Sequence, residues 1–321
     1  MEYIIISIFF VVAILMYNKL AETYNIVDNP NFRSSHTIPT IRGGGILFYI
    51  AVVLFFILSN FQYPYFFAGI SSIALVSFID DLKTLSAKVR LPFQFLAVSL
   101  VLYQVGVFNL PILVVGFIVI IGVGFINLYN FMDGINGITG LYSLAVLLGF
   151  LGINYFETIV PVNLIGYTLV AILVFGFYNF RGKARLFAGD IGSISLAVLI
   201  LFLGVSFIIQ LKAPILLLMV SVYGIDSGLT ILYRIYLKEN ITQGHRHHIY
   251  QKLVDVYQWS HLKVAISYAL VQLGVSSLVI VLYKTSLQTQ YILIGSIAVT
   301  FTIGYVLLFL AIENKKKTLG Y

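Results

Sequence analysis

Four polar side chains recur at every third position where a long apolar run ends. The run finishes in NLYNFMDGINGI, residues 127–138, which carries Asn127, Asn130, Asp133 and Asn136. In a helix, three-residue steps rotate by about 300° each, so the first three of these side chains share one broad face. Asparagine has low helix propensity, which leaves little structural reason for this recurrence. We therefore expect this face to meet a polar ligand.

Three further aspartates stand at the ends of other apolar runs. Asp80 and Asp81 occur together in FIDDL, and Asp190 occurs in FAGDIGS. Adjacent carboxylates repel each other, so a pair kept at a membrane boundary usually holds a cation or a proton. Two plain alternatives stay open. The pair could be an ordinary polar stop, and Asp190 could be the N-cap of a helix that begins at Ile191.

Glycine, basic and imidazole side chains surround these aspartates. Glycine lets the backbone approach a phosphate closely, although membrane helices also use it for close packing. The glycines concerned are Gly43, Gly44, Gly45, Gly134, Gly137, Gly189 and Gly192. The cationic and imidazole groups are Arg33, His36, Arg42, Lys88, His245, Arg246, His247 and His248. The plain alternative for the last four, in GHRHHIYQKL, is a basic loop with incidental histidines.

The donor atoms favour a hard metal ion. Carboxylate and amide oxygens suit Mg²⁺, with Mn²⁺ as the alternative ion, because both prefer oxygen ligands and phosphate. A histidine tract is compatible with transition metals, but the chain has no cysteine and no second cluster of soft ligands. The expected catalytic groups are Asp80, Asp81, Asp133 and Asp190, of which Asp80, Asp81 and Asp190 are the expected metal ligands. This set predicts phosphoryl chemistry.

The composition indicates that membrane helices position these groups. Of the 321 residues, 60% are hydrophobic and 10% are charged, against about 25% charged residues in soluble domains. Apolar runs of about 18 residues or more predict spanning helices. We expect an all-α polytopic membrane protein with about eleven transmembrane helices in one domain, residues 1–321. The expected spans are 2–20, 43–59, 64–80, 91–107, 110–130, 137–153, 160–179, 191–210, 213–233, 264–283 and 291–312.

The basic residues predict the orientation. Taking alternate connecting segments as cytoplasmic places every Lys and Arg except Lys212 and Lys284 on that side, which is 17 of the 19. Short cytoplasmic loops are enriched in these residues. We therefore expect the N-terminus outside, and the C-terminus and the active site on the cytoplasmic face. The net charge of +7 reflects this bias and anionic ligands, so no nucleic-acid partner is expected.

Five motifs also carry a family resemblance that runs through the whole chain. They are DNPNFRSSHTIPTIRGGG, IDDLKTLSAKVR, NLYNFMDGINGI, FAGDIGS and GHRHHIYQKL, in that order. With them the chain resembles the polyprenyl-phosphate N-acetylhexosamine-1-phosphate transferases, bacterial membrane enzymes that start lipid-linked glycans. The sequence YNFMDGING and the histidine motif are more similar to those of the branch that starts O-antigen or capsule than to those of the peptidoglycan branch.

The resemblance implies a reaction in the bacterial inner (cytoplasmic) membrane. Polyprenyl phosphate, usually undecaprenyl phosphate, attacks the β-phosphorus of a UDP-amino sugar such as a UDP-N-acetylhexosamine. The products are a polyprenyl-diphospho-sugar and UMP, and the reaction requires Mg²⁺. For such an enzyme, a homodimer is one possible oligomeric state.

Roles for individual residues follow from the same resemblance. Asp80 and Asp81 match the aspartate pair that engages the metal or the lipid phosphate. Asp190 matches the metal-binding aspartate of a Phe-x-Gly-Asp motif, in which Phe187 is the ring expected to stack on uracil and Gly189 is the glycine. These positions therefore predict one metal and nucleotide site.

The remaining motifs are expected to bind the nucleotide, the diphosphate and the sugar. Asn130 and Asp133 match the polar pair that contacts the nucleotide, and Asn136 stands where many members have Asp. The histidine motif supplies His245, His247 and His248, expected near the diphosphate and sugar. Other expected phosphate contacts are Arg33, His36, Arg42, Lys88 and Arg246.

Two other classes of protein remain as alternatives. A transporter or lipid flippase would suit many helices and the intramembrane Asp226, but the charges gather on one face and no internal repeat is visible. A polyprenyl-diphosphate phosphatase would share the lipid substrate. It would not need Phe187 or an Asn-rich nucleotide motif, so the transferase reading is favoured.

Overall fold

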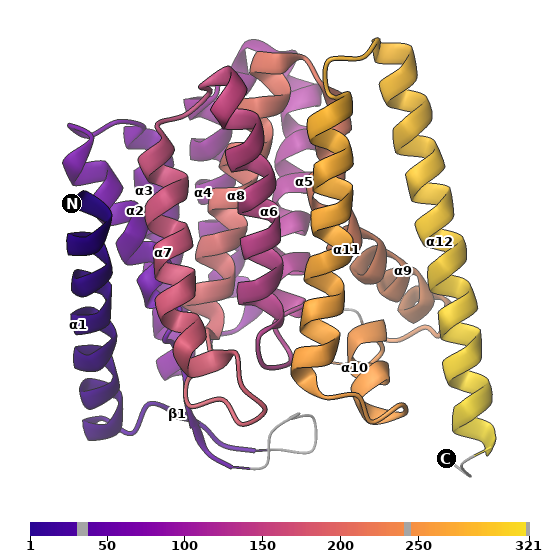
Figure 1. Ribbon diagram of the computed structural model, residues 1–321, viewed down its shortest axis with the longest axis horizontal. Helices are drawn as coiled ribbons and strands as arrows, with labels where there is room; N and C mark the ends of the chain where they lie inside the picture. Colours follow the sequence, from indigo (N-terminus) through magenta and orange to yellow (C-terminus); the bar gives the residue numbers. More distant parts are fainter. Residues whose placement is uncertain (31–37, 241–244, 319–321) are drawn as a thin grey trace.

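Helices make up most of the structure. The computed structural model describes residues 1–30, 38–240 and 245–318, and Figure 1 shows most of its helices standing side by side. Backbone N–H and C=O groups in a bilayer must be satisfied within the protein, which a helix achieves along a single segment. The first six helices are α1 Glu2–Thr23, α2 Ile46–Leu58, α3 Pro64–Leu82, α4 Ala87–Gln104, α5 Ile112–Phe131 and α6 Ile138–Glu157.

The second half of the chain continues the bundle. Its helices are α7 Val162–Asn179, α8 Gly189–Leu211, α9 Ser221–Tyr236, α10 Ile249–Asp255, α11 His261–Leu282 and α12 Leu287–Thr318. Two 3₁₀-helices, η1 Val107–Asn109 and η2 Pro214–Val220, and two short strands, β1 Val27–Asp28 and β2 Thr40–Ile41, complete the described elements.

The lengths of these helices confirm the expected all-α polytopic membrane protein. Among the described residues, nine helices are long and apolar enough to cross a membrane by length and composition. Every one of the eleven expected apolar runs overlaps a helix. α2 is shorter, at 13 residues, and α4, which carries Lys88 and Arg90 near its start, also falls outside the nine.

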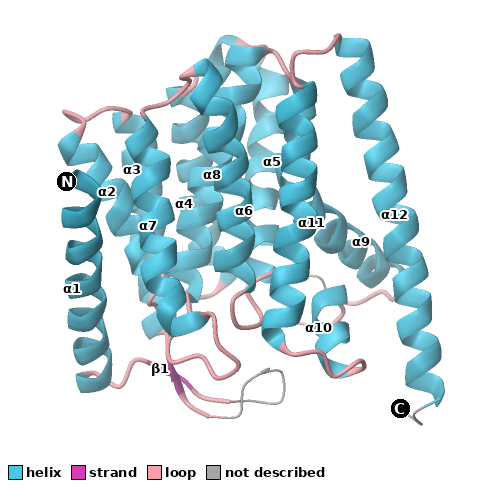
Figure 2. Cartoon of the chain, in the orientation of Figure 1, coloured by secondary structure: helices cyan, strands magenta, loops and turns pink. Residues whose placement is uncertain are grey.

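The chain ends and the loops divide between the two ends of the bundle. Figure 1 shows the N-terminus at the upper end of α1 and the C-terminus at the lower end of α12. The lower end, which we call the site end, carries the described segments 24–30, 38–45, 83–86, 132–137, 180–188, 237–240 and 245–260, and Figure 2 shows loops there in pink. At the other end, Pro64, Pro111, Pro161 and Pro214 start or cap helices, a position that suits the fixed φ angle of proline.

Two segments differ in shape from the expected apolar runs. The run 213–233 is divided into the 3₁₀-helix η2 and the α-helix α9, and Figure 1 shows α9 inclined behind α11. α12 continues to Thr318 beyond the apolar run 291–312, since the helix can go on into the polar interface where Lys315–Lys317 replace apolar residues. Hydropathy alone detects neither the 3₁₀ segment nor a helix that outlasts its apolar stretch.

A small strand pair brings distant loops together at the site end. β1 and β2 pair antiparallel, with Val27 opposite Ile41. Ile41 also bridges to Leu186 in parallel, and its carbonyl accepts the N–H of Phe187 at 2.8 Å. The N–H of Gly44 in turn donates to the Phe187 carbonyl at 2.9 Å. The segment after β2 therefore runs beside the segment that leads into α8.

Candidate active site

Asp81 fixes the beginning of α8. Its Oδ1 accepts the backbone N–H of Asp190 at 2.8 Å, and its Oδ2 accepts that of Ile191 at 3.1 Å. The Nε of Arg42 lies 2.6 Å from the same Oδ1, and the Asp81 side chain has no exposed surface. A carboxylate at a helix N-terminus satisfies backbone donors and suits the positive end of the helix dipole. Asp81, from α3, thus acts as the cap that sequence analysis considered for Asp190 itself.

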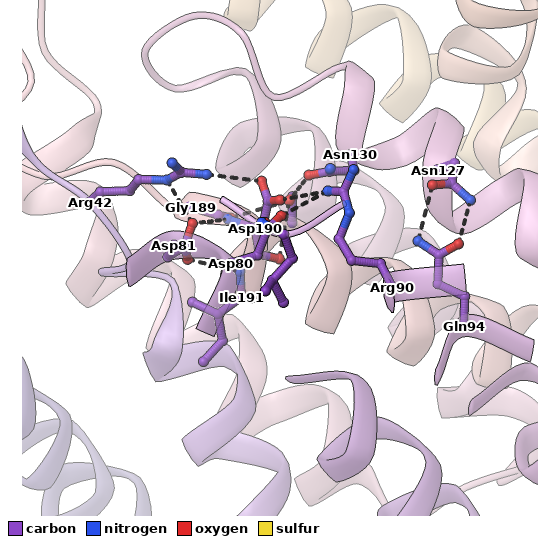
Figure 3. A network of polar contacts seen from close by, with 12 residues as sticks. Arg42, Asp80, Asp81, Arg90, Gln94, Asn127, Asn130, Gly189, Asp190 and Ile191 are labelled. Atoms are coloured by element: carbon purple, nitrogen blue, oxygen red, sulfur yellow. Dashed lines mark hydrogen bonds and ion pairs between the residues drawn. The ribbon is translucent and has the colours of Figure 1, made fainter. Parts of the chain in front are cut away.

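Asp80 and Asp190 face a common cation, as Figure 3 shows. The Nη1 of Arg90 lies 2.8 Å from Oδ2 of Asp80 and 3.2 Å from Oδ2 of Asp190. Arg90 sits at the start of α4, and helical side chains lean toward the N-terminus of their helix, here toward the end of α3. Asp80 also accepts the N–H of Leu85 through Oδ1. The turn between α3 and α4 is therefore tied to the aspartate that it positions.

Arg42 approaches the same aspartates from the segment after β2. Its Nη2 lies 3.4 Å from Oδ1 of Asp190, in addition to its contact with Asp81. The backbone carbonyl of Arg42 accepts the Tyr17 hydroxyl of α1 at 2.5 Å. Three carboxylates and two guanidinium groups thus form one cluster, which we call the aspartate cluster: Asp80, Asp81, Asp190, Arg42 and Arg90.

The glycines around the cluster are required by close packing. Gly189 has φ +71°, and a Cβ atom there would lie 2.4 Å from Oδ2 of Asp81. A Cβ on Gly45 would lie 2.3 Å from the Cα of Gly192, where α2 meets α8. At Gly134 a Cβ would lie within 2.1 Å of the Tyr250 hydroxyl. The structure therefore supports the packing alternative for these glycines, since the atoms that exclude a side chain belong to the protein.

The turn between α5 and α6 holds the polar residues of NLYNFMDGINGI. Asn127, on α5, exchanges two amide hydrogen bonds with Gln94 of α4, at 2.8 and 3.0 Å. Asn130 accepts the Ser193 hydroxyl at 2.5 Å, which links it to the first turn of α8. Asn127 is therefore bonded to another side chain of the protein, whereas Asn130 lies beside the aspartate cluster, as Figure 3 shows.

Asp133 and Asn136 follow in the same turn. Asp133 accepts the Thr139 hydroxyl at 2.6 Å. Burial, together with the negative charge of Asp81, raises the pKa of the Asp133 carboxyl to about 6. The amide nitrogen of Asn136 donates to the carbonyls of Arg181 and Gly182 at 3.1 and 3.0 Å. Asn136 thus joins two loops at the site end.

The three histidines of the motif GHRHHIYQKL form a second group at the site end. The rings of His245 and His248 lie 4.8 Å apart, and those of His245 and His247 lie 5.8 Å apart. Burial, with the charges of His248 and Arg234 adding to it, lowers the pKa of His245 to about 3, so His245 is neutral at pH 7. His247 Nε2 lies 3.0 Å from Glu239.

Arg246 and the neighbouring Tyr250 face different partners. The Nη2 of Arg246 lies 2.7 Å from Oδ1 of Asp255, an exposed residue at the end of α10. The Tyr250 hydroxyl donates to the carbonyl of Phe131 at 3.1 Å, and the ring of His245 lies 6.3 Å from that of Phe131. The segment from His245 to Tyr250 therefore packs against Phe131 at the end of α5, two residues before Asp133 in the chain.

The other expected site residues fall in three classes. Phe187 is half-buried beside the aspartate cluster, with its backbone held by Ile41 and Gly44. Lys88 is exposed on α4 and makes no contact with the aspartate cluster, whereas Arg90, two residues later in the same motif, does. The expected phosphate contact of Lys88 stays a prediction. Arg33 and His36 lie outside the described residues.

The cluster fits a hard metal ion at two of the three expected ligands. In residues 1–30, 38–240 and 245–318, no three His, Cys, Asp or Glu side chains stand together in a metal-binding arrangement. Asp80 and Asp190, however, converge on one cationic nitrogen of Arg90, so a positive charge is accommodated between their oxygens. Asp81 differs from these two, because each of its oxygens already accepts one backbone N–H group. A carboxylate oxygen has a second lone pair, so its role as a metal ligand stays a prediction.

Comparisons with known proteins find similarity to sugar-phosphate transferases that act on membrane lipids. Residues 63–208, from α3 to α8, match the model of glycosyl transferase family 4. The chain is 26% identical to undecaprenyl-phosphate alpha-N-acetylglucosaminyl 1-phosphate transferase from Thermotoga maritima over 83% of this chain and 85% of that protein. It is 28% identical to phospho-N-acetylmuramoyl-pentapeptide-transferase from Streptococcus pyogenes over 65% of this chain and 70% of that protein. A transferase with the same name as the first, from Yersinia pestis, is 27% identical over 49% of this chain and 47% of its own.

Proposed function

We propose that this chain, whose residues 63–208 match the model of glycosyl transferase family 4, transfers an N-acetylhexosamine 1-phosphate from a UDP-sugar to undecaprenyl or a related polyprenyl phosphate and releases UMP. The observation that carries the proposal is that Asp80 and Asp190 both form ion pairs with Arg90 at the site end. The relatives named for undecaprenyl phosphate and for amino-sugar or muramoyl phosphates support the same reaction class. Together they favour a transferase over a transporter or a phosphatase.

The product is a lipid-linked sugar that starts a cell-surface glycan. The relative from Thermotoga maritima covers 83% of this chain, against 65% for the pentapeptide transferase from Streptococcus pyogenes. This coverage supports the branch that uses a simple amino sugar, such as N-acetylglucosamine or a related sugar, over the peptidoglycan branch.

Mg²⁺, or Mn²⁺ in its place, would be held by Asp80 and Asp190, and when bound it would neutralise phosphate charge and polarise the P–O bond that breaks. The chain's own cations assist. Arg90 uses Nη1 for the two aspartates, and its side chain is partly exposed, so its other N–H groups can bind phosphate oxygens. Arginine suits this role because its planar fork matches phosphate geometry.

The reaction exchanges one phosphoanhydride linkage, the P–O–P bridge of the UDP-sugar, for another in the lipid diphosphate. An oxygen of the lipid phosphate forms a new bond to the β-phosphorus of the donor, and the bond from that phosphorus to the bridging oxygen breaks, so the electron pair leaves with UMP. The transition state gathers negative charge on the transferred group. Fixed cations such as Arg42 and Arg90 stabilise that charge without reorganising.

The orientation follows from the same placement of charge. Taking alternate loops as cytoplasmic assigns 17 of the 19 basic residues to the side of the membrane on which the aspartate motifs are expected. By the enrichment of Lys and Arg in cytoplasmic loops, we place the site end in the cytoplasm of a bacterial inner membrane. A cytosolic UDP-sugar and a membrane lipid can both reach a site at that face.

Isotope exchange tests the reaction. Purified protein is mixed with labelled UMP, unlabelled UDP-N-acetylhexosamines, polyprenyl phosphate and Mg²⁺, and labelled UDP-sugar is measured. We expect incorporation only when the lipid phosphate and the metal are both present, with activity lost in EDTA and restored by Mg²⁺ or Mn²⁺. Release of inorganic phosphate without exchange would identify a phosphatase. No exchange with any of the UDP-sugars, in protein that keeps its fold, would overturn the proposal.

A further inference from the structure

A buried aspartate of α9 stands outside the aspartate cluster and contacts the histidine segment. Asp226 is 3% exposed. Its Oδ2 accepts the Tyr268 hydroxyl of α11 at 2.6 Å, and its Oδ1 accepts the backbone N–H of Ile249 at 3.1 Å and the Thr230 hydroxyl at 3.3 Å. The same Oδ1 lies 3.3 Å from Nδ1 of His248. The carboxylate thus joins α9, α11 and the start of α10.

The partners of this carboxylate fix the state of the His248 ring. In the described part of the chain, no Lys or Arg forms an ion pair with Asp226, and His248 is its basic neighbour. An ionised carboxylate oxygen only accepts hydrogen bonds, so Nδ1 of His248 must carry the proton and donate it. A buried carboxylate that lacks a counter-charge is costly, which favours this contact further.

The other nitrogen of the ring is then available for a ligand. The Nε2 of His248 is buried and has no hydrogen-bond partner among the described residues. The ring is 2% exposed and stacks on Tyr250 with centroids 5.4 Å apart, and Tyr250 is bonded to Phe131 just before Asp133. A buried polar atom without a partner costs free energy unless a ligand or water satisfies it.

We propose that Asp226 is a positioning residue that acts through His248: it holds the proton on Nδ1 and the ring in place, so that the lone pair of Nε2 accepts a hydrogen bond from a sugar hydroxyl of the donor. This inference rests on the proposed transferase function. It assigns to Asp226 a role in orienting an imidazole, which differs from the coupling-ion path considered for a transporter. The arrangement follows the general rule that a partner of one imidazole nitrogen sets the state of the other.

The first test is spectroscopic and needs no enzymatic activity. Protein labelled with ¹⁵N at histidine ring nitrogens is reconstituted in lipid, and the spectrum of His248→Asn is subtracted to assign His248. We expect a protonated Nδ1 whose proton is moved strongly downfield by the carboxylate, and loss of that downfield position in Asp226→Asn. An unprotonated Nδ1 in the wild-type protein would overturn the proposal, whether or not the Asp226 variant folds.

The second test is a double-mutant cycle in the exchange and transfer assays. Asp226→Asn should lower kcat roughly 10- to 100-fold, the range seen for partners that orient ligating histidines. In the His248→Ala background the same change should lower kcat by less than about twofold, because residues that act as a unit are not additive. Losses that multiply in the double variant would show an action independent of His248.

A matched control separates orientation from packing. Tyr268→Phe removes one donor from the same carboxylate and leaves His248 untouched, so we expect kcat within about threefold of wild type and the downfield Nδ1 proton retained. If Tyr268→Phe lowered kcat as much as Asp226→Asn does, the proposed action of Asp226 through His248 would be overturned. If wild-type protein transfers no sugar at all, the transferase proposal fails, while the wild-type ¹⁵N spectrum still decides the Asp226–His248 contact.

Discussion

The backbone N–H of Asp190 donates a 2.8 Å hydrogen bond to Oδ1 of Asp81, so one aspartate holds the helix end on which the other stands. Asp80, the sequence neighbour of Asp81, instead faces Arg90 and shares that guanidinium with Asp190. Two adjacent carboxylates of α3 therefore have different partners. Their substitutions should have different consequences.

Asp81→Asn should lower stability as well as activity. The asparagine NH₂ would face either a backbone N–H or the Arg42 guanidinium, and charge-assisted hydrogen bonds of this kind contribute about 1.5–3 kcal/mol each. Asp80→Asn should lower turnover by about 100-fold or more, the scale of lost electrostatic stabilisation, with a smaller change in stability. Thermal unfolding in detergent and the transfer assay measure the two effects. Equal loss of Tm in both variants would contradict the separate roles.

Arg90 and Lys88 offer a matched pair on one helix. Arg90→Ala removes the cation that Asp80 and Asp190 share, so we expect transfer to fall by about 10-fold or more, in line with lost phosphate and carboxylate contacts. Lys88→Ala removes an exposed side chain and should leave the rate within about twofold, as surface substitutions usually do. Initial rates at saturating substrate decide the comparison. A loss of rate in Lys88→Ala larger than about twofold would show that Lys88 contributes to the site.

The sequence predicts the elements of this protein better than the partners within its site. Apolar runs such as 110–130 are long enough to require helices, and most basic residues are expected on the side of the membrane where the aspartates lie, so both the fold class and the site end follow from the sequence. The choice of Arg90 over Lys88 depends on the direction in which a side chain leaves α4. The role of Asp81 depends on how α3 meets α8. Both are tertiary relationships between segments that lie far apart in the chain.

Phe187 tests the nucleotide half of the proposed donor. If its ring stacks on uracil, Phe187→Ala should weaken UDP-sugar and UMP binding by about 1–3 kcal/mol, the range for base stacking on aromatic side chains. Phe187→Trp should keep most of the affinity, because the larger ring offers the same stacking face. Calorimetric titration with UMP measures both. Unchanged UMP affinity in Phe187→Ala would leave the ring as an ordinary aromatic of the membrane interface.

Asn136→Asp should destabilise the protein, although aspartate is common at this position in the family that the sequence resembles. The amide nitrogen of Asn136 donates to the carbonyls of Arg181 and Gly182, and an ionised carboxylate has no proton to donate. A buried carbonyl that loses its donor costs about 1–3 kcal/mol. Arg181 is half-buried and Gly182 is exposed, so water offsets part of this loss and the smaller value applies. We expect a lower Tm at pH 7 and partial recovery at acidic pH, where the aspartate is protonated. Asn136→Ala, which adds no charge, is the control and should be milder.

Asp133 should give the protein a measurable pH dependence. Burial and the charge of Asp81 raise its pKa from the usual 3.8 to about 6 in the folded protein, so between these values the folded chain binds more protons than the unfolded chain. The slope of unfolding free energy against pH follows the protons bound in the unfolded state minus those in the folded state, and here that difference is negative. The stability associated with protonated Asp133 is therefore fully present below pH 4 and is lost as pH rises through about 6.

Asp133→Asn removes this contribution and is the way to measure it. In protein treated with EDTA, the Tm of the variant minus that of the wild type should rise between pH 4 and pH 7, because the wild type alone loses stability over that window. Thr139→Val deletes the hydroxyl that donates to Asp133, which should raise the pKa of the Asp133 carboxyl further. The Tm of this variant should therefore fall more between pH 4 and pH 7 than the Tm of the wild type. A constant Tm difference across the window would show that Asp133 titrates in its ordinary range, and that its surroundings at the α5–α6 turn are more polar than its burial beside Asp81 implies.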